Sequence, residues 1–242
     1  ICACLVGSEM CIRDRIMPLF GLNLNNPMLS LPMQGLLWAL VIAISLFSID
    51  KATYKALYNV PIRQTGVLAC ALVFAVLWRI KAGILTGLDL HILGITAATL
   101  ILGWRLTILS SVLATALLAA FGLIEFELLP VQLLIGAFIP ILLSYLAFIV
   151  SYQYLPRHFF VYIFVCAFIT AGFIACIKIA LGALFYLAIG QYSWQQLADN
   201  YVYLSAIIWL PEAMLNGMAI TIMITYRPHW VKTFYDKDYL GS

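Results

Sequence analysis

Long apolar stretches, separated by short polar segments, fill most of the chain after residue 31. They do not alternate strictly, as the strands of a membrane barrel would. Most have about the 20 residues that a helix needs to cross a bilayer core about 30 Å thick. The pattern therefore predicts seven transmembrane helices. They occupy residues 32–49, 65–80, 88–104, 106–124, 131–152, 158–189 and 201–226.

The sixth stretch is too long for a simple crossing. A helix over residues 158–189 would be about 48 Å long at 1.5 Å per residue. Lys178 follows His158 by 20 residues, about one bilayer thickness, so its ammonium is expected to reach the far membrane surface. We expect this helix either to extend beyond the membrane or to break near Lys178.

The composition sets the class of protein. Of the 242 residues, 65% are hydrophobic and 10% are charged, and the mean hydropathy is +1.06. An average soluble domain is about 45–50% apolar and about 25% charged, so this chain has too little charge to cover a surface in water. A soluble enzyme and a disordered chain are excluded, and a net charge of +3 excludes the dense basic face of a nucleic-acid binder. The predicted fold is all-α, a polytopic helical bundle in the lipid bilayer.

Basic residues in the loops predict the orientation. With seven alternating helices, eight Lys and Arg residues fall on one side, and only Arg79 and Lys81 on the other. The eight are Lys51, Lys55, Arg63, Arg105, Arg157, Arg227, Lys232 and Lys237. Cytoplasmic loops carry the excess of Lys and Arg. We therefore expect the amino terminus outside and the carboxyl terminus in the cytoplasm.

The first residues differ from the rest of the chain. Residues 1–15 open without Met and resemble translated read-through of a sequencing adaptor, so we expect them to be foreign to the fold. Residues 16–31 are then an N-terminal outer segment. Residues 32–240 are expected to form a single transmembrane domain.

The segment after the second predicted helix holds the first candidate site. Gly83 and Gly87 interrupt the helical pattern there and allow close backbone approach. Asp89 and His91 follow at the start of the third predicted helix. A neutral imidazole beside a carboxylate suits a divalent metal of the Co, Ni, Cu and Zn group, so both residues are candidate metal ligands. The alternative is that Asp89 caps the helix and both residues are interfacial polar groups.

The last apolar stretch holds the second candidate site. Glu212 lies near its middle, where an unpaired charge is costly and polar groups are often functional. Asn216 follows one helical turn later, on the same face. Both are candidate helpers at a metal site. The alternative is an interhelical hydrogen bond that fixes the packing.

Other chemistry is weakly indicated. His158 and His229 could ligate haem, but both stand at helix ends beside arginines, so we expect interfacial residues and no permanently bound cofactor. The sequence has no His-Glu-x-x-His helix, no Gly-x-Ser-x-Gly turn and no Gly-x-x-x-x-Gly-Lys-Ser/Thr loop. We therefore predict that the protein is not an enzyme.

Several short sequences point to a known family. Residues 91–97 (HILGITA) and 102–104 (LGW) are similar to a His-Leu-Leu-Gly-Thr pattern followed by Leu-Gly-Pro/Trp, and residues 212–217 (EAMLNG) to Gly-Glu-x-x-Ile-Thr-Gly. These patterns belong to the CbiM-like cobalt/nickel permeases, the substrate-specific membrane components of energy-coupling-factor transporters. Residues 155–162 (LPRHFFVY) and 227–231 (RPHWV) resemble a proteobacterial branch of that family. The resemblance covers about residues 35–240.

The resemblance implies a seven-helix fold with an extracellular amino terminus and transport of Co²⁺ or Ni²⁺. It also implies that His91 is a metal ligand, together with an amino-terminal Met-His pair. The chain departs from that start, because no Met among its first 33 residues is followed by His. His91 then remains a candidate ligand, with Asp89, Glu212 or Asn216 as helpers.

Two functions of different classes are compatible with these observations. The first is the substrate-capture subunit of an energy-coupling-factor-type ABC transporter for a divalent transition metal, with ATPase and transmembrane coupling subunits in trans. The second is a non-transporting membrane accessory or assembly protein of a metal- or redox-enzyme pathway, which would bind no metal.

Overall fold

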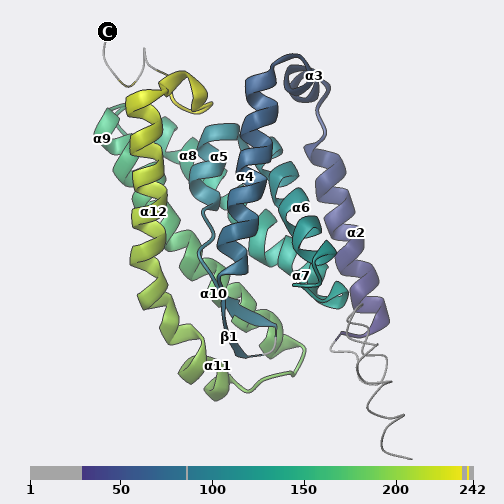
Figure 1. Cartoon of the computed structure of the whole chain (residues 1–242). Helices are drawn as coiled ribbons and strands as arrows, with labels where there is room; N and C mark the ends of the chain where they lie inside the picture. Colours follow the sequence, from purple (N-terminus) through teal and green to yellow (C-terminus); the bar gives the residue numbers. More distant parts are fainter. Residues whose placement is uncertain (1–28, 86, 236–238, 240–242) are drawn as a thin grey trace, which may run out of the picture.

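A computed structural model describes residues 29–85, 87–235 and 239 of the chain. Residues 1–28 lie outside the described residues, and with them the segment predicted to be foreign and most of the predicted outer segment. The described part is a bundle of long helices with one short β-hairpin at one end (Figure 1).

Five helical segments are long and apolar enough to cross a membrane. They are α2 (Leu31–Ser48), α4 (Pro61–Arg79), and the runs Phe126–Tyr154, Phe159–Ala188 and Trp194–Tyr226. A sixth helix, α6 (Trp104–Ala120), is apolar and somewhat shorter. Helices thus form at six of the seven predicted crossings, and the polytopic all-α class is confirmed.

The three long runs change helical type along their length. The first comprises η2 (Phe126–Leu128), α7 (Leu129–Leu133), η3 (Leu134–Phe138) and α8 (Ile139–Tyr154). The second comprises α9 (Phe159–Val161), η4 (Tyr162–Ile169) and α10 (Thr170–Ala188). The third comprises α11 (Trp194–Asn200), η5 (Val202–Leu204) and α12 (Ser205–Tyr226), with η6 (Pro228–Trp230) after it. η3 and η4 are π-helical, a feature that is frequent at functional sites.

The prediction of a third continuous helix over residues 88–104 is wrong. The chain there forms β2 (Leu88–Leu90), an extended segment and α5 (Ile95–Leu102), whose eight residues span only about 12 Å. β2 pairs with β1 (Ala82–Leu85) in an antiparallel hairpin. Gly87 and Gly94 have φ angles of 82° and 67°, which glycine adopts readily and which interrupt a helix. This segment nevertheless runs from the end of α4 to the start of α6, at opposite ends of the bundle (Figure 1), so the third predicted crossing is only partly helical.

The expectation for Lys178 is also wrong. α10 continues unbroken past Lys178, and the residue is only 7% exposed. Its Nζ donates to the backbone oxygen of Asp89 at 3.0 Å. The ammonium stays inside the bundle because β2 brings the Asp89 carbonyl to it. The prediction of uninterrupted helices did not include such an acceptor.

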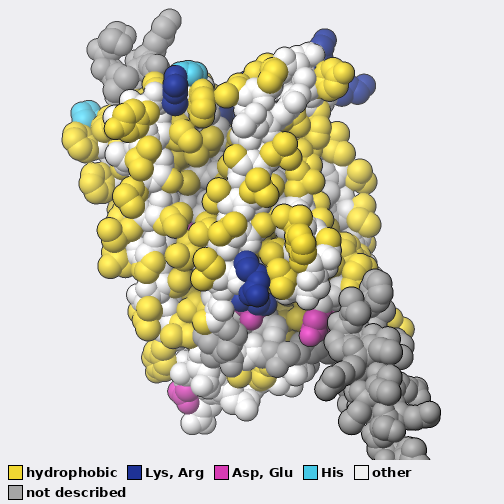
Figure 2. Space-filling model, in the orientation of Figure 1, with side chains coloured by type: hydrophobic (Ala, Val, Ile, Leu, Met, Phe, Trp, Pro, Cys, Tyr) yellow, Lys and Arg dark blue, Asp and Glu magenta, His cyan; other side chains and the backbone are white. Residues whose placement is uncertain are grey.

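Charged side chains are separated along the bundle. α3 (Lys51–Asn59) and η6 lie at one end, which we call the basic end, and the hairpin lies at the other, the hairpin end (Figures 1 and 2). At the basic end Arg105 pairs with Asp50 at 2.9 Å. Hydrogen bonds from the hydroxyl and the backbone N–H of Thr53 lower the pKa of Asp50. The separation agrees with the predicted orientation, which remains a prediction.

Candidate functional site

The hairpin end contains a cavity of about 450 Å³ between the hairpin, α4, α6, α7 and α10. Its polar lining comes from Trp78, Arg79, Lys81, Asp89, His91, Glu125, Gln132 and Tyr186. The hydroxyl of Tyr186 is buried and has no hydrogen-bond partner among the described residues. The cavity therefore combines cationic, anionic and neutral polar groups within a largely apolar bundle.

His91 is held in an orientation that suits a metal ligand. The residue is 5% exposed, and its Nδ1 lies 3.3 Å from the backbone oxygen of Ile92. Its Nε2 lies 3.3 Å from the Nε2 of Gln132. The Ile92 carbonyl can only accept and the Gln132 amide nitrogen can only donate, so these contacts fit the tautomer with the proton on Nδ1 and the Nε2 lone pair directed at Gln132. A metal-bound imidazole commonly uses its second nitrogen in this way.

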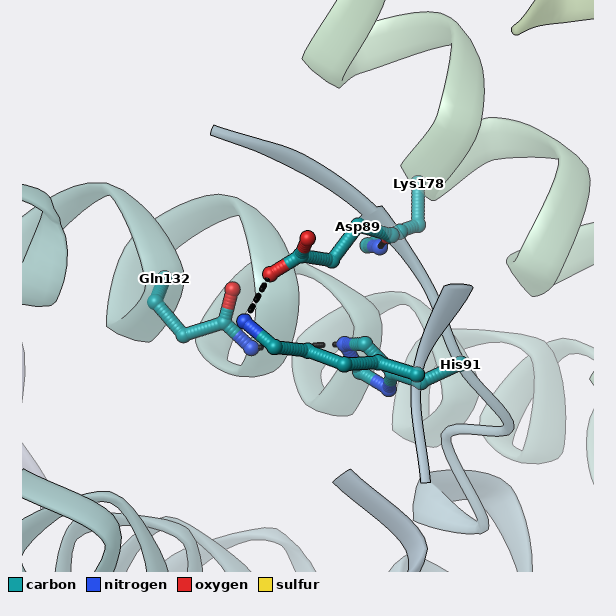
Figure 3. A network of polar contacts seen from close by, with 5 residues as sticks. Asp89, His91, Gln132 and Lys178 are labelled. Atoms are coloured by element: carbon teal, nitrogen blue, oxygen red, sulfur yellow. Dashed lines mark hydrogen bonds and ion pairs between the residues drawn. The ribbon is translucent and has the colours of Figure 1, made fainter. Parts of the chain in front are cut away.

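Asp89 and His91 reach the same cavity because the backbone is extended there. Residues two apart on an extended chain point to the same side, and the two side chains accordingly both line the cavity. Asp89 forms an ion pair with Lys81 through its carboxylate, and its backbone oxygen accepts from Lys178. Figure 3 shows the Gln132 amide next to the His91 ring, with the Asp89 carboxylate near them and Lys178 reaching Asp89 from α10. The structure thus brings together the two residues of the first predicted site.

Glu212 and Asn216 lie behind His91 and are not part of the cavity lining. The Glu212 carboxylate accepts from the backbone N–H groups of Leu93 and Gly94 at 2.7 and 2.8 Å. Asn216 Oδ1 accepts from the N–H of Ala97 at 2.8 Å, and its Nδ2 donates to Glu212 Oε1 at 2.9 Å. These are the backbone donors that the start of a helix leaves unpaired. Both side chains of α12 therefore hold the start of α5 and the residues just after His91.

The far end of α5 is held by the chain that follows α12. The N–H groups of Lys232 and Thr233 donate to the backbone oxygens of Ile101 and Leu100, at 2.9 and 3.3 Å. The Thr233 hydroxyl also donates to Leu100 O at 2.8 Å. The short helix that follows His91 is thus bound at both ends by α12 and its continuation.

The described residues contain no group of three or more His, Cys, Asp and Glu side chains that could hold a metal ion. Sequence reasoning assigned only Asp89 and His91 to this cavity. It did not assign the other polar lining groups, among them Lys81, Gln132 and Tyr186, and it placed Lys178 at the membrane surface. The only signal for Gln132 and Lys178 was a polar residue within an apolar stretch. His158 and His229 are exposed at the basic end, as expected of interfacial residues.

The long apolar helices define a polytopic helical membrane protein, and the polar cavity at the hairpin end is its candidate functional site. The family model for CbiM, the cobalt uptake substrate-specific transmembrane region, matches residues 23–230. The chain therefore belongs to the CbiM family, as the sequence resemblance predicted. Members of this family are membrane components of transporters and not enzymes, and they work with other transporter subunits. Searches of the curated proteins and of the solved structures each found no match.

Proposed function

We propose that this protein is the substrate-capture subunit of an energy-coupling-factor-type ABC transporter and that it binds Co²⁺ or Ni²⁺ in the cavity at the hairpin end. The observation that carries the proposal is His91, whose Nδ1 is engaged with a backbone carbonyl and whose Nε2 faces the cavity. The carboxylate of Asp89 lines the same cavity. Imidazole and carboxylate together suit divalent metals of the Co and Ni group.

In this proposal the protein lies in the bacterial inner membrane with the hairpin end outside. The metal enters the cavity, displaces the Gln132 amide from His91 and is held by His91 and Asp89. Glu212 and Asn216 keep the backbone after His91 in place. ATPase and transmembrane coupling subunits in trans supply the energy, because the sequence contains no phosphate-binding loop of its own.

His91→Ala tests the proposal by elemental analysis. We expect the purified protein, exposed to Co, Ni, Cu, Zn and Mn and then washed, to retain about one Co or Ni per chain. His91→Ala should lower metal affinity by at least about 100-fold, the upper range seen when a group supporting a metal ligand is lost. His229→Ala is the matched control, because His229 is exposed at the basic end and its loss should leave binding unchanged.

Metal that is retained by His91→Ala, or lost equally from His229→Ala, would contradict the proposal. If the protein retained no metal and copurified with partners other than an ATPase, an accessory or assembly role would be favoured instead. Copurification of an ATPase and a membrane coupling subunit with the unmodified protein would support the transporter.

A further inference from the structure

Two lysines contact Asp89 in different ways. Lys178 donates to the backbone oxygen at 3.0 Å and is 7% exposed. Lys81 pairs with the carboxylate, and the Lys81 and Asp89 side chains keep 33% and 28% of their exposure. Lys178 therefore anchors the strand from within the bundle (Figure 3). The ammonium of Lys81 is free to exchange the carboxylate for water.

We propose that Lys81 is an internal counter-ion that competes with the divalent substrate for the Asp89 carboxylate. The inference rests on the proposed function, in which Asp89 and His91 bind the metal. An ammonium and a metal ion both seek the carboxylate oxygens, and each neutralises the same charge. A metal bound by both residues must therefore displace the Lys81 ammonium from Asp89.

The hairpin keeps this competitor in place. Lys81 immediately precedes β1, and Gly83 pairs with Asp89 across the antiparallel ladder. The ammonium is thus tethered within reach of the carboxylate, which gives it a high effective concentration that a free ion must exceed. Arg79 lines the same cavity but forms no ion pair among the described residues.

The competition between Lys81 and the substrate favours divalent over monovalent cations. A monovalent cation that replaced the ammonium would bring the same single charge and would lose its own hydration. A divalent cation brings one additional charge, and it also gains the Nε2 lone pair of His91. Lys81 therefore discriminates against Na⁺ and K⁺ and lowers the affinity for the divalent metal, which favours its later release.

Calorimetric titration of the purified full-length protein with CoCl₂ tests the inference. Lys81→Met is expected to bind Co²⁺ about fivefold more tightly, which corresponds to about 1 kcal/mol, the upper range for a partly exposed ion pair. Arg79→Met removes the same charge from the same cavity without freeing Asp89, and should tighten binding less than Lys81→Met does. Lys81→Arg keeps a cation near Asp89, so this variant should bind Co²⁺ with nearly the affinity of the unmodified protein.

The gain also has to depend on Asp89. In an Asp89→Asn background, Lys81→Met should bring no further tightening, because the shared carboxylate is gone. Three results would overturn the inference: unchanged or weaker binding in Lys81→Met, an equal gain in Arg79→Met, or a gain that persists without Asp89. Cobalt binding that His91→Ala leaves intact would instead overturn the proposed function. Binding that depends on His91 but not on Lys81 would overturn this inference alone, and no binding in any variant would overturn both.

Discussion

Replacing Glu212 with alanine is expected to lower the free energy of unfolding by about 3 kcal/mol. The substitution leaves the N–H groups of Leu93 and Gly94 without their acceptor, and it removes a partner of the Asn216 amide. Glu212 is 1% exposed, so water cannot replace the carboxylate. Each buried donor left unpaired costs about 1–3 kcal/mol. Thermal unfolding of the detergent-solubilised protein measures the effect.

Two further variants separate the role of Glu212 from its burial. Glu212→Gln keeps the size but has one acceptor oxygen in place of two, and should lose about half as much stability as Glu212→Ala. Thr225→Val is the matched control in the same helix, because this exposed hydroxyl donates only to the carbonyl one turn earlier, and it should be nearly neutral. A Glu212→Ala protein as stable as the control would show that α5 is held by other contacts.

The second large effect is expected at Gly87, in the turn of the hairpin. Gly87 has a φ of 82°, and a Cβ built on it would stand 2.1 Å from the hydroxyl oxygen and 2.7 Å from Cζ of Tyr186. Tyr186 is 1% exposed, so its ring cannot move away into solvent. Gly87→Ala combines a left-handed backbone cost of about 1–2 kcal/mol with overpacking of about 1–3 kcal/mol. We expect a loss of about 2–5 kcal/mol in thermal unfolding.

Gly122→Ala provides the comparison that isolates the steric part. Gly122 has a φ of 67°, and a Cβ built there meets nothing within 4 Å. Its substitution should cost only the backbone contribution, about 1–2 kcal/mol. Tyr186→Phe, which removes the clashing oxygen, should recover part of the loss in Gly87→Ala. Equal losses in Gly87→Ala and Gly122→Ala would mean that the hairpin turn does not press against Tyr186.

The sequence predicts most of the helices because each needs only a sufficiently long apolar stretch. It does not locate the break in the third crossing, because residues 88–104 are apolar enough, despite Asp89 and His91, to resemble a membrane helix. The break is stabilised by distant groups, among them Glu212 and Asn216, which lie more than 115 residues away and pair with the backbone of α5 and the residues before it. The local amino-acid composition does not indicate such long-range contacts.

The candidate site was also only partly predictable from the sequence. Asp89 and His91 are close in sequence, so an extended backbone is enough to bring both to one cavity. Helices α7 and α10 contribute Gln132 and Tyr186 to the cavity lining, and α10 also contributes Lys178, which contacts Asp89. Only the folded bundle shows which of these polar side chains meet. The same long-range packing assigns Glu212 and Asn216 to the support of α5, where the sequence suggested direct help at a metal.

The double attachment of α5 has a consequence for its dynamics. An isolated helix of eight residues would fray and unfold readily in water. Here α12 pairs with the N–H of Ala97 in its first turn and with the N–H groups of the two residues before the helix, and residues 232 and 233 pair with the carbonyls of its last turn. Neither end can open before the contacts with α12 and its continuation break. Amide hydrogen exchange in α5 should therefore be as slow as in α12, and should accelerate along the whole of α5 when the contact at either end is removed.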